Sequence, residues 1–300
     1  MELRHLRYYT ALAEELHFGR AAKRLGIAQP ALSQQIRQLE RELGVTLLLR
    51  ANRRVSLTGA GRVFLERARA TLEQADEAVR LARQAGRGEM GHISVGVVTS
   101  ALYGIFPDVV RVFRQRYPEV HLTLHELSAM EQTQAFRTGR IQVSFLRPPL
   151  DDPELSLRVV HEEAWLVALP SAHRMTESAC VTLRSLAGQP FIQFPRELAA
   201  GLYDQIIAMC QRAGFSPKVV QEAQMQTIVS LVAAGIGIAL VPASLENLRR
   251  QGVSYRPLKG ATPKVQLAVV WRKDDASPVL RSFLSVVREV SGQPGGAHYI

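Results

Sequence analysis

The sequence has few of the features that mark secreted, membrane-spanning or metal-dependent proteins. Only two cysteines occur among its 300 residues, Cys180 and Cys210, and neither has a Cys-x-x-Cys partner or a histidine at metal-ligand spacing. We therefore expect two free, buried thiols in a reducing compartment, with no disulfide and no metal site. The longest apolar stretch, residues 228–243, contains two glycines and a proline. It is shorter than the roughly 20 residues that a membrane-spanning helix needs.

Signals for export and for catalysis are also missing. Residues 1–7 lack the apolar core and small-residue cleavage site of a secretory signal, so we expect a cytoplasmic protein with no membrane partner. No Gly-x-Ser-x-Gly, His-Glu-x-x-His or Walker motif is present, and Gly235-Ile-Gly237 is followed by strand-forming residues rather than by a dinucleotide loop. We expect neither an enzyme nor a cofactor.

Positive charge is concentrated in the first quarter of the chain. The net charge is +10, and residues 1–70 hold 13 Lys or Arg against 6 Asp or Glu, a balance of +7. A small basic segment joined to a nearly neutral body is typical of a nucleic-acid-binding module attached to another domain.

Two short amphipathic helices that meet at a glycine are the most informative pattern. They are the helix predicted over 19–25, for which Gly26 suits the C-cap, and the helix that begins near Gln29. Apolar residues at helical spacing predict a further helix before them, over 3–15. One face of the third helix is leucine-rich, and the opposite face carries short polar side chains. Glutamine and serine there suit base edges in the major groove, whereas arginines farther along suit phosphates. The alternative is a small helical domain whose polar face is only solvated.

A two-stranded wing is predicted after residue 44. Two short apolar runs flank the polar tip Asn52-Arg53-Arg54, whose arginines would enter a minor groove or contact phosphate only. The predicted DNA-contacting residues are Gln29, Pro30, Ser33, Gln34, Arg37, Arg53 and Arg54.

A long helix follows over about residues 58–86. Its small and apolar residues recur at steps of four and three, which is a heptad pattern. The expected seam consists of Gly61, Leu65, Ala68, Leu72, Ala75, Val79 and Ala82. We expect this helix to pair with a second copy, so that two reading heads meet two half-sites; packing on its own body is the alternative. The predicted domains are 1–58 (DNA binding), 59–88 (linker and dimerisation) and 89–300 (the remaining body).

The remaining body alternates strand-like and helix-like segments, which predicts an α/β fold with mostly parallel sheets. Ligands in such folds bind beyond the carboxyl ends of strands, near helix N-termini. Thr99, Ser100, Ser128 and Arg147 occupy such positions and would suit a small carboxylate. The hydroxyls could instead be helix caps, and the arginine could form a surface ion pair.

The whole chain resembles the LysR-type transcriptional regulators. The resemblance is carried by residues 3–9, 21–25, 27–44 and 57–61, the third of these reading Ile-Ala-Gln-Pro-Ala-Leu-Ser-Gln-Gln-Ile-Arg-Gln-Leu-Glu-Arg-Glu-Leu-Gly. Residues 1–7, 102–108 and 232–244 look like those of the regulators of benzoate, catechol and chlorocatechol breakdown.

This resemblance implies a winged helix-turn-helix, a long linker helix and an effector domain of two α/β lobes like a periplasmic binding protein. Lobe I would cover about 92–162 and 267–291, and lobe II about 163–266. It implies a homotetramer that binds double-stranded DNA, a small effector and RNA polymerase, with Gln29, Ser33, Gln34 and Arg53 contacting DNA. The effector residues it implies are Ser100, Ser128 and Arg147, with Phe194, Gly201 and Tyr203 on the facing lobe; with Thr99 from the strand ends, these make seven predicted effector residues.

Three positions depart from the family's pattern. Many relatives have serine where this chain has Ala28, which removes a cap, and many have arginine at position 34. The muconate-responsive relatives have threonine at the position of Ala129, which argues against a dicarboxylate effector. From the residues alone, a cytoplasmic binding protein or an enzyme built on the α/β body, with DNA binding secondary, is the competing interpretation.

Overall fold

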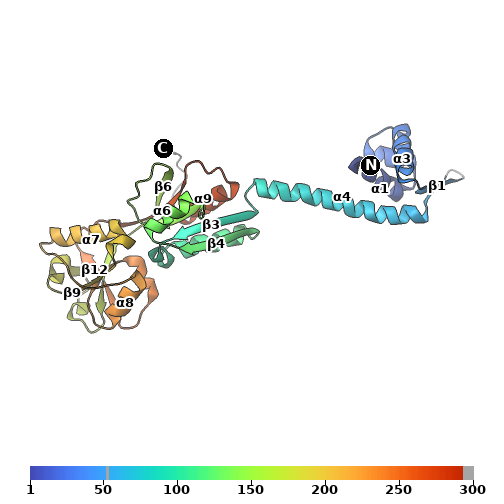
Figure 1. Ribbon diagram of the computed structural model, residues 1–300. Coiled ribbons are helices and arrows are strands. Elements are labelled where there is room, and N and C mark those ends of the chain that lie inside the picture. Colours follow the sequence, from blue (N-terminus) through green and yellow to red (C-terminus); the bar gives the residue numbers. More distant parts are fainter. Residues whose placement is uncertain (52–53, 293–300) are drawn as a thin grey trace. The chain divides into compact units, whose positions relative to one another are not determined.

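The computed structural model describes residues 1–51 and 54–292, and its contacts divide the chain into two compact units, Met1–Gln84 and Ala85–Ile300 (Figure 1). Among the described residues, no helix combines the length and the apolar composition that crossing a membrane requires. The first unit contains three short helices, a two-stranded antiparallel sheet and most of a long helix. These elements are α1 (Leu3–Glu15), α2 (Phe18–Leu25), α3 (Gln29–Leu43), β1 (Leu48–Ala51), β2 (Arg54–Leu57) and α4 (Gly59–Gly86).

The three short helices form where the sequence predicts them, because each has an apolar stripe and a glycine or left-handed residue at its end. Gly26 and Gly44 close α2 and α3 with φ of 69° and 70°. Helix α2 begins one residue earlier than expected, since Nδ1 of His17 accepts the backbone N–H groups of Gly19 and Arg20 at 3.1 and 3.2 Å. A histidine cap of this kind has no simple sequence signature.

The first turns of α4 pack against the helices of their own unit. The hydroxyl of Tyr9 donates to the carbonyl oxygen of Gly61 at 2.8 Å, and the rings of Tyr9 and Phe64 meet edge to face with centroids 5.1 Å apart. A Cβ on Gly61 would lie 2.1 Å from the carbonyl oxygen of Leu47, so only glycine permits this approach. Burial raises the pKa of Tyr9 to about 12, with Glu40 adding to the effect.

The expected heptad seam is therefore wrong in its first part. Gly61 and Ala68 are buried within the unit, and Leu65 packs against its core. Leu72 and Ala75 are half-buried, whereas the last seam positions, Val79 and Ala82, are exposed. The periodicity of small and apolar residues is the same whichever partner covers them, so sequence alone could not separate the two roles.

The second unit contains two lobes, each built on its own sheet. Lobe I has five strands in the order β4-β3-β5-β13-β6, with α5 and α9 packed together over the sheet (Figure 1). Its strands are β3 (Gly91–Val97), β4 (Val120–Glu126), β5 (Val143–Leu146), β6 (Leu155–Glu163) and β13 (Val265–Arg272). Its helices are η1 (Thr99–Tyr103), α5 (Phe106–Arg116), α6 (Ala129–Arg137) and α9 (Pro278–Val290).

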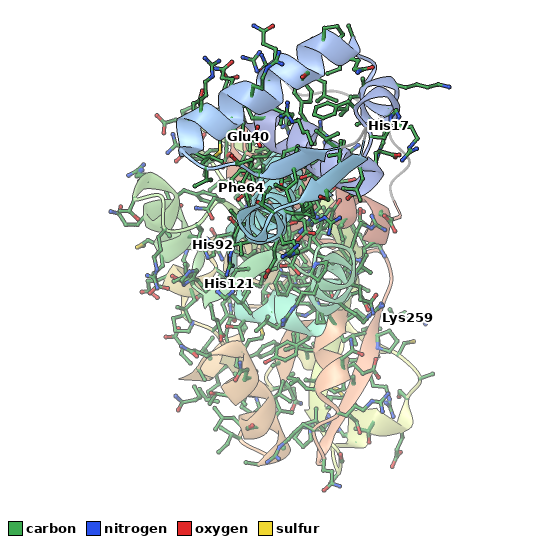
Figure 2. All side chains as sticks on the ribbon, turned by 90° about the vertical axis from the view of Figure 1, so that its right-hand side faces the viewer. His17, Glu40, Phe64, His92, His121 and Lys259 are labelled. Atoms are coloured by element: carbon green, nitrogen blue, oxygen red, sulfur yellow. The ribbon has the colours of Figure 1, made fainter. Side chains whose placement is uncertain are left out.

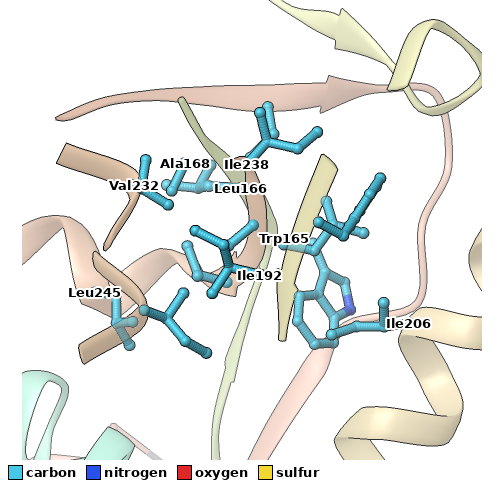
Figure 3. Close-up of a cluster of buried hydrophobic side chains, with 14 of the residues drawn as sticks. Trp165, Leu166, Ala168, Ile192, Ile206, Val232, Ile238 and Leu245 are labelled. Carbon is cyan, nitrogen blue, oxygen red and sulfur yellow. The ribbon is translucent and has the colours of Figure 1, made fainter. Parts of the chain in front are cut away.

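Lobe II has a four-stranded sheet in the order β11-β7-β12-β8 and a parallel pair, β9 and β10. A core that includes Trp165, Ile192 and Ile206 fills the space between its sheets and helices (Figure 3). The strands are β7 (Trp165–Pro170), β8 (Val181–Thr182), β9 (Pro190–Gln193), β10 (Lys218–Glu222), β11 (Ala239–Pro242) and β12 (Val253–Lys259). The helices are η2 (Arg174–Glu177), η3 (Leu183–Leu186), η4 (Arg196–Leu198), α7 (Ala200–Arg212), α8 (Met225–Ala233) and η5 (Ala243–Leu248).

The expectation of mostly parallel sheets is wrong. Strand β13 is antiparallel to both β5 and β6, and β7 is antiparallel to both β11 and β12. The chain leaves lobe I after β6 and returns to it along β13, so these neighbouring strands run in opposite directions. Alternation of strands and helices could not reveal that two connections pass between the lobes.

The expectation of two buried thiols is correct for one cysteine only. Cys210 is buried on α7, and burial raises the pKa of its thiol to about 11. Cys180 is exposed, because it lies in the polar loop that precedes β8.

Candidate DNA interface and ligand cleft

The polar face of α3 lies on the outside of the first unit. Leu32, Ile36 and Leu39 have no exposed surface, and the outward positions between them carry the predicted DNA-contacting side chains. Of these, Ser33 is half-buried, and Gln29, Pro30, Gln34 and Arg37 are exposed. Each of the five is therefore placed where a duplex could reach it.

The N-terminus of α3 is open. Its N-cap residue is Ala28, which supplies no side-chain hydrogen bond, and Pro30 occupies the first turn. Backbone N–H groups and the positive end of the helix dipole are thus left for an external acceptor such as a phosphate oxygen.

A buried histidine fixes α3 against α1. Nδ1 of His5 accepts the backbone N–H of Glu2 at 3.0 Å, so the ring proton is on Nε2, which donates to Oε1 of Gln35 at 2.9 Å. The His5 side chain is 2% exposed. The contact fixes how α3 is rotated about its axis, and therefore which side chains it presents.

Glu40 joins α3 to the wing (Figure 2). One carboxylate oxygen accepts the backbone N–H groups of Leu47 and Leu48 at 2.9 and 3.1 Å, and the other pairs with Arg50 at 3.0 Å. The guanidinium of Arg50 also stacks over the ring of Phe18, 5.1 Å from its centroid. Sequence reasoning missed Glu40, because its partners become neighbours only when the wing folds back.

Of the two predicted wing arginines, the structure describes the backbone of Arg54 only. Arg53, like Asn52, lies outside the described residues. Arg54 begins β2, where its backbone pairs with Ala51.

A cavity of about 670 Å³ lies between the two lobes of the second unit. Six of the seven predicted effector residues line it, namely Thr99, Ser100, Ser128, Arg147, Phe194 and Gly201. Tyr203 does not: it packs the edge of its ring against Phe194, with centroids 6.4 Å apart. Tyr203 therefore supports the wall rather than facing the cavity, because the first turn of α7 points it toward the core of lobe II.

The guanidinium of Arg147 is already paired. Its side chain is 4% exposed and donates to Oε1 of Glu163 at 2.9 Å, while Nε donates to the hydroxyl of Ser100 at 3.1 Å. Burial lowers the pKa of Arg147, and the Glu163 carboxylate opposes that shift. The alternative considered from the sequence, a surface ion pair, is therefore right about the ion pair and wrong about its place, which is buried.

Glu163 also ties the two lobes together. It ends β6, the strand that leaves lobe I, and its carboxylate accepts the backbone N–H and the hydroxyl of Ser244. Ser244 follows β11 of lobe II. Neither residue was expected from the sequence, since their contact spans 81 positions.

The predicted hydroxyls are also engaged within the protein. Ser128 is the N-cap of α6: its hydroxyl accepts the N–H of Glu131 at 3.3 Å, and its own N–H donates to the Glu131 carboxylate at 2.7 Å. The hydroxyl of Thr99 donates to Glu126. The helix-cap alternative therefore holds for Ser128.

Position 201 in the cavity wall has room for glycine only. A Cβ there would lie 2.4 Å from Cδ of Pro149 and 2.7 Å from the carbonyl oxygen of Pro148, both in lobe I. The glycine lets the start of α7 approach the opposite lobe and places free backbone N–H groups at the cavity wall.

Two family models match the two parts of the chain. The family model "Bacterial regulatory helix-turn-helix protein, lysR family" matches residues 3–62, and "LysR substrate binding domain" matches residues 86–292. The HTH-type transcriptional regulator AlsR of Bacillus subtilis is 40% identical over 287 residues, covering 95% of each chain. The HTH-type transcriptional regulator CatR of Pseudomonas putida is 38% identical over 290 residues, covering 96% of this chain and 99% of CatR.

A solved full-length structure has the same fold. The crystal structure of CbnR, a LysR family transcriptional regulator, superposes with a TM-score of 0.89 at 30% identity, over 96% of this chain and all of CbnR. The structure of CbnR complexed with its target DNA gives a TM-score of 0.85 at 30% identity, over 97% and 100% of the two chains.

Proposed function

Because the chain belongs to the LysR family of bacterial transcriptional regulators, we propose that α3 reads operator DNA and that a small molecule in the lobe cavity controls this binding. The observation that carries the proposal is the exposed polar ridge of α3, backed by side chains with no exposed surface. A ridge of this kind fits the width of a major groove.

Each DNA-contacting residue has a proposed role. Gln29 and Gln34 pair with adenine edges, Ser33 contacts a neighbouring base, and Pro30 shapes the first turn that enters the groove. Arg37 binds phosphate, and Arg53 and Arg54 of the wing contact the adjacent backbone or minor groove. CbnR, whose complex with target DNA has been solved, supports this placement by its similarity to the whole chain.

We place the dimer interface on the exposed part of α4. Val79 is 49% exposed, and Leu72 and Ala75 are half-buried, so residues from Leu72 onward can still pair with a second copy. The proposed domains remain 1–58, 59–88 and 89–300, although the first turns of α4 serve the DNA-binding unit. Two dimers forming a tetramer would engage successive half-sites.

The proposed effector carries a carboxylate. The N-termini of α7 and α8 open onto the cavity, and neither N-cap residue, Ala199 or Gln224, supplies a side-chain hydrogen bond. Free N–H groups at helix N-termini bind anions. The N–H groups of Arg147 that are not bound to Ser100, Glu163 or the carbonyl oxygen of Gln266 add to them.

The remaining parts of the proposal concern the cell. We propose a cytoplasmic protein without catalytic activity that acts on transcription by contact with RNA polymerase, as an activator. Relatives whose names include the words "transcriptional activator" support the activator role.

The proposed function is tested with the DNA upstream of the protein's own gene. A gel shift should give a complex that survives excess random DNA, and footprinting should reveal two protected segments with related inverted sequences. Binding no tighter than to random DNA of equal length would contradict the proposal.

A further inference from the structure

The charged side chains that line the cavity are mostly acidic. Glu126 ends β4, Glu131 lies in the first turn of α6, and Glu197 lies in η4 on the opposite lobe. Arg147 is the only basic residue among the described residues of the lining. A simple anion would therefore enter a negative surrounding.

Arg147 does not offset the charge of these carboxylates, because its own charge is neutralised by Glu163. The Glu163 carboxylate lies 2.9 Å from the guanidinium, and both side chains are nearly fully buried, at 4% and 6% exposure. The pair contributes hydrogen-bond donors to the cavity but no net charge.

Two of the carboxylates form one wall in lobe I, on either side of Ser128. One oxygen of Glu126 accepts the Thr99 hydroxyl, and one oxygen of Glu131 accepts the Ser128 N–H. The second oxygen of each makes no hydrogen bond to any described residue, so each is available to a ligand. The hydrogen bond from the Ser128 backbone also lowers the pKa of Glu131.

The opposite wall, in lobe II, combines the Glu197 carboxylate with the positive ends of two helices. The N-termini of α7 and α8, helices of 13 and 9 residues, face the cavity without a side-chain cap. Apolar side chains from both lobes also line the cavity. These are Leu127, Met130, Phe194, Leu198 and Met225.

Building on the proposed function, we infer that the effector is an amino-acid-type zwitterion with an apolar side chain. Its ammonium group binds Glu126 and Glu131 on lobe I, and its carboxylate binds the N-termini of α7 and α8 on lobe II. Its side chain packs against the apolar residues of the cavity lining. A ligand of opposite charge at its two ends joins the two walls and favours the closed cavity. A dicarboxylate would place one charge against the acidic wall.

The test is calorimetric titration of the full-length protein with matched probes. L-Phenylalanine, L-leucine and L-methionine are each compared with the acid that lacks the amine and with the amine that lacks the carboxylate. At least one amino acid should bind about tenfold tighter than both of its truncated forms. Glu131→Gln and Glu126→Gln should each remove this preference for the amino acid over the acid.

Both substitutions preserve the local fold. Glutamine at position 131 keeps the capping box with Ser128, and an amide oxygen at 126 still accepts from Thr99. Glu119→Gln, in the exposed turn just before β4, is the matched control and should leave all affinities unchanged.

The inference is overturned if the acids bind as tightly as the amino acids, if the Gln variants keep the preference, or if no probe binds at millimolar concentration. Gel shifts with the upstream DNA distinguish this failure from failure of the proposed function. Specific DNA binding together with any of these results rejects only the ligand class.

Discussion

The carboxylate of Glu163 holds the guanidinium of Arg147 at 2.9 Å in the interior of the effector unit, and the same carboxylate binds the N–H of Ser244 in the other lobe. Removing one member of a buried ion pair leaves the other charge uncompensated, which costs more than losing both. Loss of the ligand response in an Arg147 variant therefore does not by itself show that Arg147 contacts the ligand, because the variant also disrupts this buried ion pair.

Arg147→Met should lower the free energy of unfolding of the effector unit by about 3–5 kcal/mol, measured by urea denaturation. Arg147→Met combined with Glu163→Gln should recover most of that loss, because the amide keeps an acceptor for Ser244 and no charge is left unpaired. A double variant no more stable than the single one would show that the pairing is not what stabilises this region.

Gly61→Ala should destabilise the DNA-binding unit by about 1–3 kcal/mol, because the added Cβ would overlap the carbonyl oxygen of Leu47 and crowd the Tyr9 hydroxyl. Thermal unfolding measures the effect. Gly59→Ala is the matched control in the same helix: its Cβ meets nothing within 4 Å, so any change there should be small. Equal effects at both positions would rule out close packing as the reason for Gly61.

Ala28→Ser should stabilise α3 by about 1 kcal/mol, since serine at an N-cap accepts an N–H that alanine leaves unpaired. Chemical denaturation of the variant measures this gain. Ala31→Ser, at an exposed position inside α3, should instead be neutral or slightly destabilising. The explanation fails if serine is equally favourable at the two positions.

Glu14→Gln should destabilise the first unit by about 0.5 kcal/mol near neutral pH. The carboxylate accepts from Arg69 and Arg24, both at 2.8 Å, and these bonds lower the pKa of Glu14 in the folded state. Its contribution is therefore complete above the unfolded pKa and disappears as the pH falls through the folded pKa. Denaturation of both proteins at neutral and strongly acidic pH should show the difference vanishing; a difference that persists in acid would contradict the ionic explanation.

The DNA-binding head could be predicted from the sequence because its signals are local. The stripe of α3, the glycines that end α2 and α3, and the polar face all lie between Gly26 and Gly44. Short-range periodicity and capping determine such elements almost completely.

The contacts that organise the cavity could not be predicted, because they depend on sheet register. Glu163 meets Arg147 and Ser244 only after β6, β5 and β11 are placed in their sheets. Strand β12 has a weak sequence signal for a different reason, because Pro257 lies inside it and proline is unfavourable within a strand.

The central claim, that the ridge of α3 reads base edges, is tested most directly by comparing operator and random DNA at one salt concentration. The double variant Gln29→Ala/Ser33→Ala should lose about tenfold or more in operator affinity while its affinity for random DNA changes little. Arg37→Ala, a phosphate contact in this account, should weaken both to a similar degree. If the double variant loses equal affinity for the two DNAs, the ridge does not read sequence and the account is wrong.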